Sequence, residues 1–316
     1  MNSLWIDSCK EIRPKFPTLN ENINVDVCVV GSGLTGITCA YLLSKAGLNV
    51  CVVEKDEIAH HASGNTTAKI TSGHGLFYSY LINTFSEELA KAYLEANENA
   101  ITNIKSIIDE ENIECDFEWQ DNYVFTNDEN EISKIKDEIF VLNKLDYKAE
   151  FIEKIDYPIN ILAGVKYSNQ AQFNPLKYVY ALCKRIENNS GHIYENSKVI
   201  DIKQSGDFYN TFTNSNCITS KYVVLATGYP IINFNGFYFL KMYQEASYLI
   251  AVDTKCDLPT GMYINTKSPI TSLRNAIYNG KKILLVGGSN FKVGDEYDFS
   301  NAYKNLENTA KSMYPN

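Results

Sequence analysis

Residues 25–55 constrain this chain more than any other stretch of its sequence. They begin with a short apolar run rich in β-branched residues, 25–30, which predicts a buried strand. Three glycines follow in the pattern Gly-x-Gly-x-x-Gly, and the apolar residues of 37–47 then recur at helical spacing. A second apolar run, 48–53, predicts another buried strand and ends beside Glu54. Strand, glycine turn, helix and strand in this order predict a βαβ unit that carries the dinucleotide-binding fingerprint.

Each residue type in the glycine turn has a physical role in binding a dinucleotide. Gly31 allows the tight turn out of the strand, and Gly33 lets a pyrophosphate approach the backbone. Gly36 lets the helix pack closely on the strand. Leu34 and Thr35 lie between the glycines, where the helix N-terminus offers free N–H groups and a positive dipole end to phosphates.

Glu54 lies about 20 residues beyond the glycines, at the position where an acid binds the diol of a ribose. This acid favours NAD or FAD over NADP, because a 2′-phosphate would face a like charge. The adjacent Lys55 joins the candidate cofactor-binding residues. The alternative is a glycine turn in an α/β fold that binds no ligand.

Composition excludes several classes of protein. The 316 residues are 45% hydrophobic, enough for a large core and for one or two domains. The formal net charge of −9 is unlike the basic footprint of a nucleic-acid-binding protein. We expect no signal peptide, because residues 1–24 are polar and contain prolines, and no membrane span, because no apolar run reaches about 18 residues. The 8 cysteines include no CxxC or CxH pair, so we expect core thiols, no metal site and a cytoplasmic location.

Periodicity and turn residues predict the remaining elements. Asn174 is an expected N-cap, with Pro175 at the first helical position, and Asn279-Gly280 is expected to turn a hairpin. For residues 1–24 we expect an irregular arm that packs on the first domain. We expect helices over residues 86–111, 129–145, 174–188 and 300–313. We expect strands over residues 116–126, 151–158, 161–167, 197–203, 209–212, 217–218, 219–228, 245–252, 271–276 and 282–287.

A segment of small and hydroxyl-bearing residues, 56–75, follows the second strand of the βαβ unit. Its composition suits a loop whose backbone runs against a ligand. The alternative is a solvated surface loop.

Four features occur in an order that is typical of one family. They are the glycine fingerprint, the small-residue loop, a Pro-headed helix that leads to Gly191 and Val199, and the strand at residues 223–228. The sequence resembles the FAD-dependent amine and amino-acid oxidases, the family of D-amino acid oxidase, glycine oxidase and sarcosine oxidase. It is most similar to bacterial oxidoreductases in which Trp-x-Asp-Ser, here residues 5–8, precedes the fingerprint. In these relatives Thr-Thr-Ala-Lys-Ile-Thr, here residues 66–71, follows it.

The resemblance implies an α/β fold, α+β overall. In that fold a Rossmann-type, GR2-like FAD-binding domain is interleaved with a substrate domain, whose antiparallel sheet roofs the flavin. We expect the FAD-binding domain over residues 1–85 and 160–232. We expect the substrate or cap domain over residues 86–159 and 233–316.

The resemblance also implies FAD as the cofactor and a role for each matched position. Gly31, Gly33 and Gly36 would hold the pyrophosphate, and Glu54 the adenosine ribose. The backbone of Val199 would face the adenine. The positions expected along the pyrophosphate, ribityl chain and flavin ring are Ser63, Gly64, Thr66 and Thr67, followed by Ala226, Thr227 and Gly228 near the pyrophosphate and ribityl region.

The chemistry that the resemblance implies is hydride transfer from the C–H next to an amine to flavin N5, which gives an imine. The substrate would be an amino acid or a primary or secondary amine, and the electron acceptor oxygen or a redox partner. Arg274 is expected to grip a substrate carboxylate, the alternative being a surface salt bridge. His74 is expected to touch the substrate or tune the flavin, the alternative being a hydrogen-bonded histidine packed in its loop.

Two further motifs invite a functional interpretation. His61 precedes Ala62-Ser63-Gly64, a context in which relatives similar to dimethylglycine dehydrogenase link a histidine covalently to the flavin. Non-covalent binding is the favoured alternative. The glycines at 287, 288 and 294 suggest a second nucleotide site, which we reject because no convincing apolar helix follows them.

Family members continue beyond the helix expected at residues 300–313, with a segment that closes the FAD sheet and covers the pyrimidine side of the flavin. The most similar subgroup also often carries a C-terminal Rieske iron–sulfur domain, whose CxH and CxxH motifs this sequence lacks. We therefore expect a C-terminally truncated member that binds FAD or ADP with reduced affinity.

Three classes of function stay open. The first is a FAD-dependent amine or amino-acid oxidoreductase. The second is a non-catalytic FAD- or ADP-binding protein, or a subunit completed by a partner chain. The third, an NAD-dependent dehydrogenase, is disfavoured because the hydroxyl-rich loop and the Ala-Thr-Gly strand have no role there.

Overall fold

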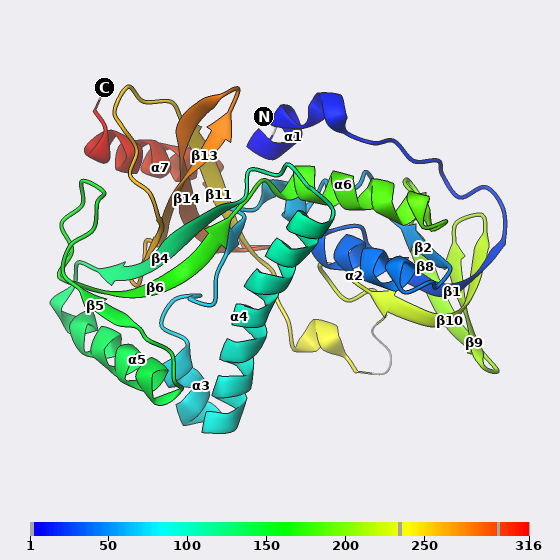
Figure 1. Ribbon diagram of the computed structural model, residues 1–316, viewed down its shortest axis with the longest axis horizontal. Coiled ribbons are helices and arrows are strands. Elements are labelled where there is room, and N and C mark those ends of the chain that lie inside the picture. Colours follow the sequence, from blue (N-terminus) through cyan, green and yellow to red (C-terminus); the bar gives the residue numbers. More distant parts are fainter. Residues whose placement is uncertain (1–2, 233–235, 296–297, 316) are drawn as a thin grey trace. The chain divides into compact units, whose positions relative to one another are not determined.

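The computed structural model describes residues 3–232, 236–295 and 298–315, which form two compact units (Figure 1). Unit 1 comprises the described residues of Met1–Thr66, Ile113–Cys115 and Asn174–Gln244. Unit 2 comprises those of Thr67–Asn112, Asp116–Phe173 and Glu245–Asn316. Both units are discontinuous along the chain, and their identity as an FAD-binding and a substrate domain stays a prediction.

The boundaries of the units differ from the expected domain boundaries. Residues 67–85 and 160–173, expected in the FAD-binding domain, belong to unit 2. There, β3 (Lys69–Ile70) pairs with β6 (Ala163–Gln172) in the sheet of that unit. Periodicity can identify a strand, but it does not reveal which sheet accepts the hydrogen bonds of that strand.

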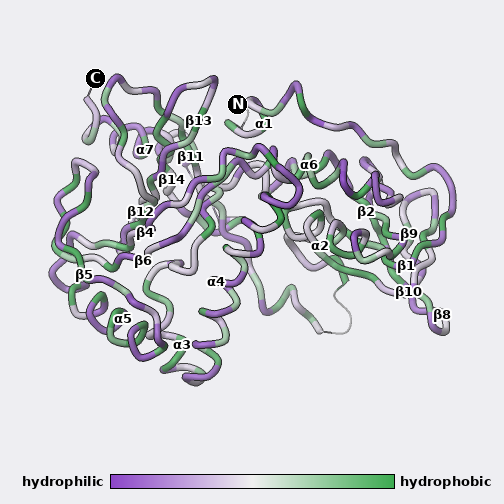
Figure 2. Tube along the Cα trace, in the orientation of Figure 1, coloured by the Kyte–Doolittle hydropathy of each residue, from purple (hydrophilic) through white to green (hydrophobic). Residues whose placement is uncertain are grey.

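A mixed sheet forms the centre of unit 1, with the strand order β7-β2-β1-β10-β9-β8 in its described residues. The first four of these strands run parallel, and the last two continue the sheet antiparallel. β1 and β2 consist largely of apolar residues, which Figure 2 colours green. The strands are β1 (Ile23–Val30), β2 (Val50–Val53), β7 (His192–Tyr194), β8 (Val199–Ser205), β9 (Phe208–Thr213) and β10 (Cys217–Leu225).

Two helices of unit 1, α2 (Leu34–Lys45) and α6 (Pro175–Asn188), pack against each other. Helix α6 begins as predicted: the Asn174 side chain accepts hydrogen bonds from the amides of Leu176 and Lys177, and Pro175 occupies the first helical position. Helix α2 ends at Lys45, just before Gly47, whose φ of 88° suits glycine. Both helix boundaries therefore follow from local sequence signals.

Residues 3–22, which we call the N-terminal arm, pack on unit 1 as predicted. The expectation that this arm is irregular is wrong in part. It contains α1 (Leu4–Ser8) and the 3₁₀ helix η1 (Lys10–Ile12). The Ser3 side chain caps α1 by accepting a hydrogen bond from the Trp5 amide.

The sheet of unit 2 has the order β11-β14-β13-β12-β4-β6-β3 in the described residues, and β5 also pairs with β6. All neighbouring pairs are antiparallel except β12 and β4, which run parallel. The strands not yet given are β4 (Glu118–Thr126), β5 (Glu150–Ile152), β11 (Glu245–Val252), β12 (Met262–Asn265), β13 (Thr271–Tyr278) and β14 (Lys281–Lys292).

The hairpin between β13 and β14 forms as predicted. Asn279 and Gly280 have φ values of 49° and 77°, the pair of positive angles that a type I′ turn requires. Other expected strands differ in extent. The strand expected over residues 151–158 is confined to β5, and those expected over 217–218 and 219–228 form the single strand β10.

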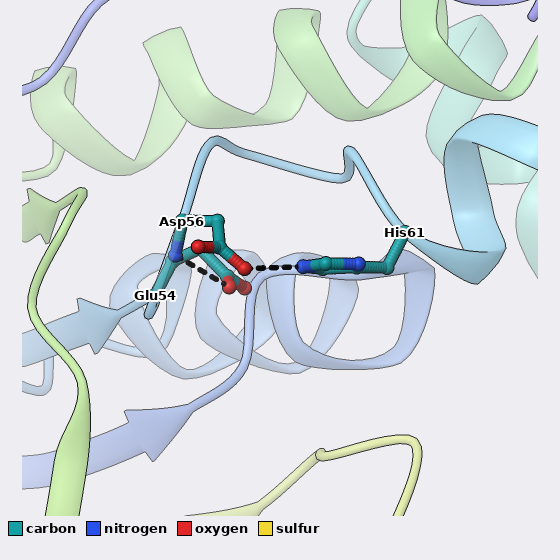
Figure 3. Close-up of side chains that lie close together, drawn as sticks. All are labelled: Glu54, Asp56 and His61. Atoms are coloured by element: carbon teal, nitrogen blue, oxygen red, sulfur yellow. Dashed lines mark hydrogen bonds and ion pairs between the residues drawn. The ribbon is translucent and has the colours of Figure 1, made fainter.

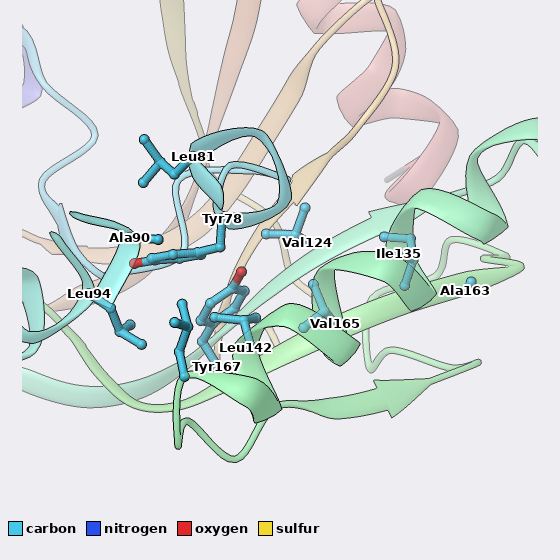
Figure 4. Packing of buried hydrophobic residues seen from close by; sticks show 11 residues of the cluster. Tyr78, Leu81, Ala90, Leu94, Val124, Ile135, Leu142, Ala163, Val165 and Tyr167 are labelled. Atoms are coloured by element: carbon cyan, nitrogen blue, oxygen red, sulfur yellow. The ribbon is translucent and has the colours of Figure 1, made fainter. Parts of the chain in front are cut away.

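Helices complete unit 2 and build its cores. Side chains from α3 (Tyr78–Thr84), α4 (Glu87–Glu110) and α5 (Ile132–Lys144) pack with those of β4 and β6 in one hydrophobic cluster (Figure 4). Helix α7 (Phe299–Met313) contributes to a second cluster with β12, β13 and β14. None of the helices in the described part of the chain combines the length and the apolar character that a membrane crossing requires.

Candidate dinucleotide-binding site

A cavity of about 770 Å³ opens in unit 1 where β1, β2 and β10 reach their carboxyl ends. Ligands of parallel α/β sheets bind at this edge. The predicted cofactor-binding residues that line the cavity are Gly31, Gly33, Leu34, Thr35, Glu54, Lys55, His61, Ser63, Val199, Ala226, Thr227 and Gly228.

The glycine turn is packed against itself and against the residue that follows β10. Gly31 has a φ of 102°, and a Cβ there would lie 2.6 Å from the carbonyl oxygen of Ala226. A Cβ on Gly36 would lie 1.9 Å from the carbonyl oxygen of Gly31. Neither position has room for a side chain, so these two glycines are required by the tight turn and by the close approach of α2.

Gly33 and Gly228 differ from the packed glycines. A Cβ on Gly33 would meet mainly the Ser63 hydroxyl, at 2.9 Å, and a Cβ on Gly228 would meet nothing within 4 Å. Both residues line the cavity, so their missing side chains leave room where a ligand would approach the backbone. The Ser63 hydroxyl also accepts a hydrogen bond from the Leu34 amide at 3.0 Å, at the N-terminus of α2.

Glu54 is buried at the end of β2 and holds the glycine turn. Its Oε2 accepts hydrogen bonds from the Ser32 amide at 3.0 Å and from the Ser32 hydroxyl at 2.7 Å. Its Oε1 accepts a hydrogen bond from the Asp56 amide at 3.1 Å. The carboxylate is therefore fixed between the turn and the cavity, at the position expected for a ribose-binding acid.

Asp56 and His61 form an exposed pair beside Glu54 (Figure 3). Nε2 of His61 lies 2.6 Å from Oδ2 of Asp56, and this hydrogen bond lowers the pKa of Asp56 below its ordinary value. Ligand atoms of the three side chains lie within 4.8 Å of one another, which would also permit a metal ion. The expectation of no metal site stays a prediction, and Glu54 itself is engaged in holding the turn.

Four predicted cofactor-binding residues do not line the cavity: Gly36, which packs against the turn, and Gly64, Thr66 and Thr67. Gly64 is buried, and a Cβ there would lie 2.5 Å from the carbonyl oxygen of Ala59, so Gly64 shapes the loop. The carbonyl of Thr66 accepts a hydrogen bond within unit 1, from Trp5 Nε1. Thr67 belongs to unit 2, where its methyl carbon is 3.5 Å from the Cβ position of Gly287.

Several cavity residues were missed by sequence reasoning. Ser32, Lys198 and Tyr229 line the cavity, and each is a direct neighbour of a predicted residue. Gln244 also lines it, although no predicted residue is near it in the sequence. Adjacency could have found the first three, whereas only the folded structure brings Gln244 to the cavity.

Arg274 lies in unit 2 on β13, and it is only 2% exposed. Its Nη1 donates to the carbonyl of Ala68 at 2.7 Å, and its Nη2 to that of Phe173 at 3.4 Å. Burial lowers the pKa of Arg274 to about 9. The interpretation as a surface salt bridge is therefore wrong. The role in gripping a substrate carboxylate stays a prediction, because the guanidinium is directed at backbone carbonyls.

His74 is exposed in unit 2, and its Nδ1 lies 2.9 Å from the hydroxyl of Tyr93. The two rings also make an edge-to-face contact. Desolvation lowers the pKa of His74 below its ordinary value. This arrangement is that of a hydrogen-bonded histidine in its loop, and contact with substrate stays a prediction.

The βαβ unit, its glycine turn, the buried acid and the cavity at the strand ends define a dinucleotide-binding α/β protein with a second, largely antiparallel sheet. The cavity, its open glycines and the amides at the N-terminus of α2 fit the ADP half of such a cofactor. The chain belongs to the DAO family of FAD-dependent oxidoreductases, which matches residues 26–316. FAD is thus the cofactor of its family, and the resemblance seen in the sequence is confirmed.

Relatives and solved structures agree with this assignment. The chain is 36% identical over 300 residues to a protein of Bacillus subtilis named as a Rieske 2Fe-2S iron–sulfur protein, YhfW, covering 95% of this chain and 59% of that one. It is 26% identical over 233 residues to the gamma-glutamylputrescine oxidoreductase of Escherichia coli, covering 71% and 54%. The crystal structure of L-proline dehydrogenase from P. horikoshii superposes with a TM-score of 0.74 at 17% identity, covering 94% and 78%, and shows the shared fold. The chain thus spans little more than half the length of these two curated relatives.

Proposed function

We propose that this chain is the flavin-binding part of an oxidoreductase that oxidises an amino acid or another amine at the C–H next to nitrogen. The observation that carries the proposal is the cavity at the ends of β1, β2 and β10, with the glycine turn on one side and Glu54 fixed beside it. A nitrogen-bearing substrate is supported by the names of a relative, gamma-glutamylputrescine oxidoreductase, and of a structural neighbour, L-proline dehydrogenase.

The residues of unit 1 would bind and orient FAD. The amides at the start of α2 would donate to the pyrophosphate, and that of Leu34 would exchange its hydrogen bond with the Ser63 hydroxyl for one with a phosphate oxygen. Glu54 would accept hydrogen bonds from the ribose diol, and the backbone at Val199 would meet the adenine. FAD, when bound, would accept the hydride from the substrate.

The residues of unit 2 would serve the substrate. Arg274 is one of only three arginines in the chain, and we propose it as the partner of a substrate carboxylate. That role requires its guanidinium to exchange a backbone carbonyl for the carboxylate. His74 is proposed to contact the substrate or the flavin from its loop.

A second candidate function is a non-catalytic FAD- or ADP-binding protein, or a subunit that a partner chain completes. The chain covers 59% and 54% of the length of two relatives, so the activity in their names stays a proposal for this chain. The electron acceptor, oxygen or a redox partner, and the formation of a homo-oligomer also belong to the proposal.

A spectrum of the purified protein tests both candidates. We expect the two visible absorption bands of an oxidised flavin, and their loss when an amine or amino-acid substrate is added without oxygen. A panel of D- and L-amino acids and of primary and secondary amines would identify the substrate class. Flavin bands that no member of the panel bleaches would favour the second candidate. A protein that binds neither FAD nor ADP would contradict both.

The same sample tests the mode of flavin attachment. We expect acid precipitation to leave all yellow colour in the supernatant, because the Nε2 of His61 is engaged by Asp56. Colour retained in the pellet would support a covalent link to His61 instead. A His61→Ala variant serves as the control, since it cannot form that link.

A further inference from the structure

The loop after β2, residues 57–66, supplies one side of the dinucleotide cavity, and we call it the cofactor loop. No strand pairing holds its backbone, which contains only the short 3₁₀ helix η2 (Ala62–Asn65). Ala59 in this loop has a φ of 55°, a left-handed conformation that is unfavourable for a residue with a side chain. Such a conformation persists only where the surrounding structure enforces it.

Two residues of the N-terminal arm hold the end of the cofactor loop. The indole Nε1 of Trp5 donates a hydrogen bond of 2.7 Å to the carbonyl of Thr66. The hydroxyl of Ser3 donates to the carbonyl of Gly64. Trp5 is 1% exposed, so the hydrogen bond that it makes is shielded from competition by water.

A buried carboxylate ties the arm to the start of the same loop. Oε1 of Glu195 accepts hydrogen bonds from the Ile58 amide at 2.7 Å and from Nη2 of Arg13 at 2.5 Å. Its Oε2 accepts a hydrogen bond from the Phe16 amide at 3.2 Å. Glu195 is 3% exposed, so one carboxylate joins the arm and the residue directly before Ala59 in a desolvated setting.

The arm also packs against the loop between these two anchors. Side-chain carbons of Ile6 lie 3.5 Å from the position that a Cβ would occupy on Gly64. The next residue back, Ser63, accepts a hydrogen bond from the Leu34 amide of the glycine turn. The contacts therefore run from the arm, through the loop, to the N-terminus of α2 beside the cavity.

We propose that the N-terminal arm is a positioning element of the dinucleotide site, with Trp5 as its main positioning residue. None of the described arm residues lines the cavity, so the arm acts through the cofactor loop. Holding the loop before the ligand arrives removes part of the ordering cost of binding. The inference rests on the proposed function only in taking ADP and FAD as ligands of the cavity.

Trp5→Phe tests the proposal, because it keeps an aromatic ring and removes the N–H donor. We expect the dissociation constants for ADP and for FAD, measured by calorimetry on the full chain, to rise about three- to tenfold. Amide hydrogen exchange should speed up in the cofactor loop, while exchange in β1 and β2 stays unchanged. Trp119→Phe is the matched control, since Trp119 is 48% exposed in unit 2 and should leave both measurements unchanged.

Ser3→Ala provides a milder second variant should Trp5→Phe fail to fold, and it should shift both measurements in the same direction. Unchanged ADP affinity in the folded variants would overturn the proposal, whether or not loop exchange speeds up. Failure of the proposed function has a different signature, because the wild-type chain itself would then bind neither ADP nor FAD.

Discussion

Glu138 on α5 accepts a hydrogen bond of 2.8 Å from the amide of Tyr78, 60 residues away in the sequence. The same carboxylate accepts hydrogen bonds from the amides of Phe77 and Ser79, each at 2.8 Å. Because α3 begins at Tyr78, a buried acid from another helix takes the place of an N-cap. The negative charge also lies at the positive end of that helix.

Glu138→Ala should therefore lower the free energy of unfolding by about 3 kcal/mol, since three helix-start amides lose their acceptor in the core. Asp137→Ala is the control, because Asp137 is the exposed neighbour on the same helix and should change stability by less than about 0.5 kcal/mol. Urea denaturation of both variants measures the difference. Equal stability of the two would show that the three amides find other partners.

Gly36→Ala and Gly228→Ala separate a packing glycine from a ligand-facing one. A Cβ at position 36 would lie 1.9 Å from a backbone oxygen, so Gly36→Ala should cost more than about 2 kcal/mol of stability even without ligand. A Cβ at position 228 meets open space, so Gly228→Ala should leave the unfolding midpoint unchanged and weaken FAD binding. Thermal melts and FAD titrations check both, and undiminished FAD affinity of Gly228→Ala would place the cofactor elsewhere.

Glu54→Gln should weaken ADP binding about tenfold, because a charged acceptor for the ribose diol becomes neutral. The variant should also discriminate less between ADP and ADP that carries a 2′-phosphate, because the negative charge that repels this phosphate is removed. Asp56→Asn is the control, because its carboxylate holds His61 and makes no hydrogen bond with Ser32. Calorimetric titration measures the dissociation constants of both nucleotides. If Glu54→Gln prefers ADP to the 2′-phosphorylated nucleotide as strongly as the wild type does, Glu54 does not bind the ribose.

Lys69 predicts a pH dependence of stability. Desolvation, with a smaller effect of the Arg274 charge, lowers the pKa of Lys69 from 10.5 to about 7, and its Nζ donates to the carbonyl of Tyr263 at 2.7 Å. Between these two pKa values the unfolded chain binds one more proton than the folded chain, so the contribution of Lys69 to stability rises with pH. It is complete above about pH 10.5 and is lost as the pH falls through about 7.

Lys69→Met removes this titration. The difference in unfolding free energy between the wild type and Lys69→Met should therefore shift in favour of the wild type as the pH rises from 7 to 10. Denaturation series at several pH values measure it. A difference that stays constant across this range would mean that the pKa of Lys69 is not lowered by folding.

Much of the fold could be predicted because its signals are local. The βαβ unit depends on apolar runs and a glycine turn within residues 25–55, and β1, α2 and β2 formed there. The N-cap Asn174 with Pro175, and the hairpin turn at Asn279 and Gly280, were equally visible. In each case the residue type itself dictates the backbone conformation.

Other features could not be predicted, because they depend on contacts between distant residues. Arg274 was expected at a surface or in a substrate site, and the structure buries its guanidinium against carbonyls of Ala68 and Phe173. Helix α3 was not expected, since its first amides are satisfied by Glu138 rather than by a local cap. A backbone carbonyl or amide carries no residue-specific signal that would reveal its distant partner.

The sequence by itself determined that this chain binds a dinucleotide and belongs with the FAD-dependent oxidoreductases, because the fingerprint and its flanking strands are contiguous. Only the tertiary structure decided how the cavity is assembled. It brought Trp5 to the carbonyl of Thr66 and Glu195 to the amide of Ile58. The physical reason is that these hydrogen bonds join side chains to main-chain groups far away in the sequence, and only packing selects such partners.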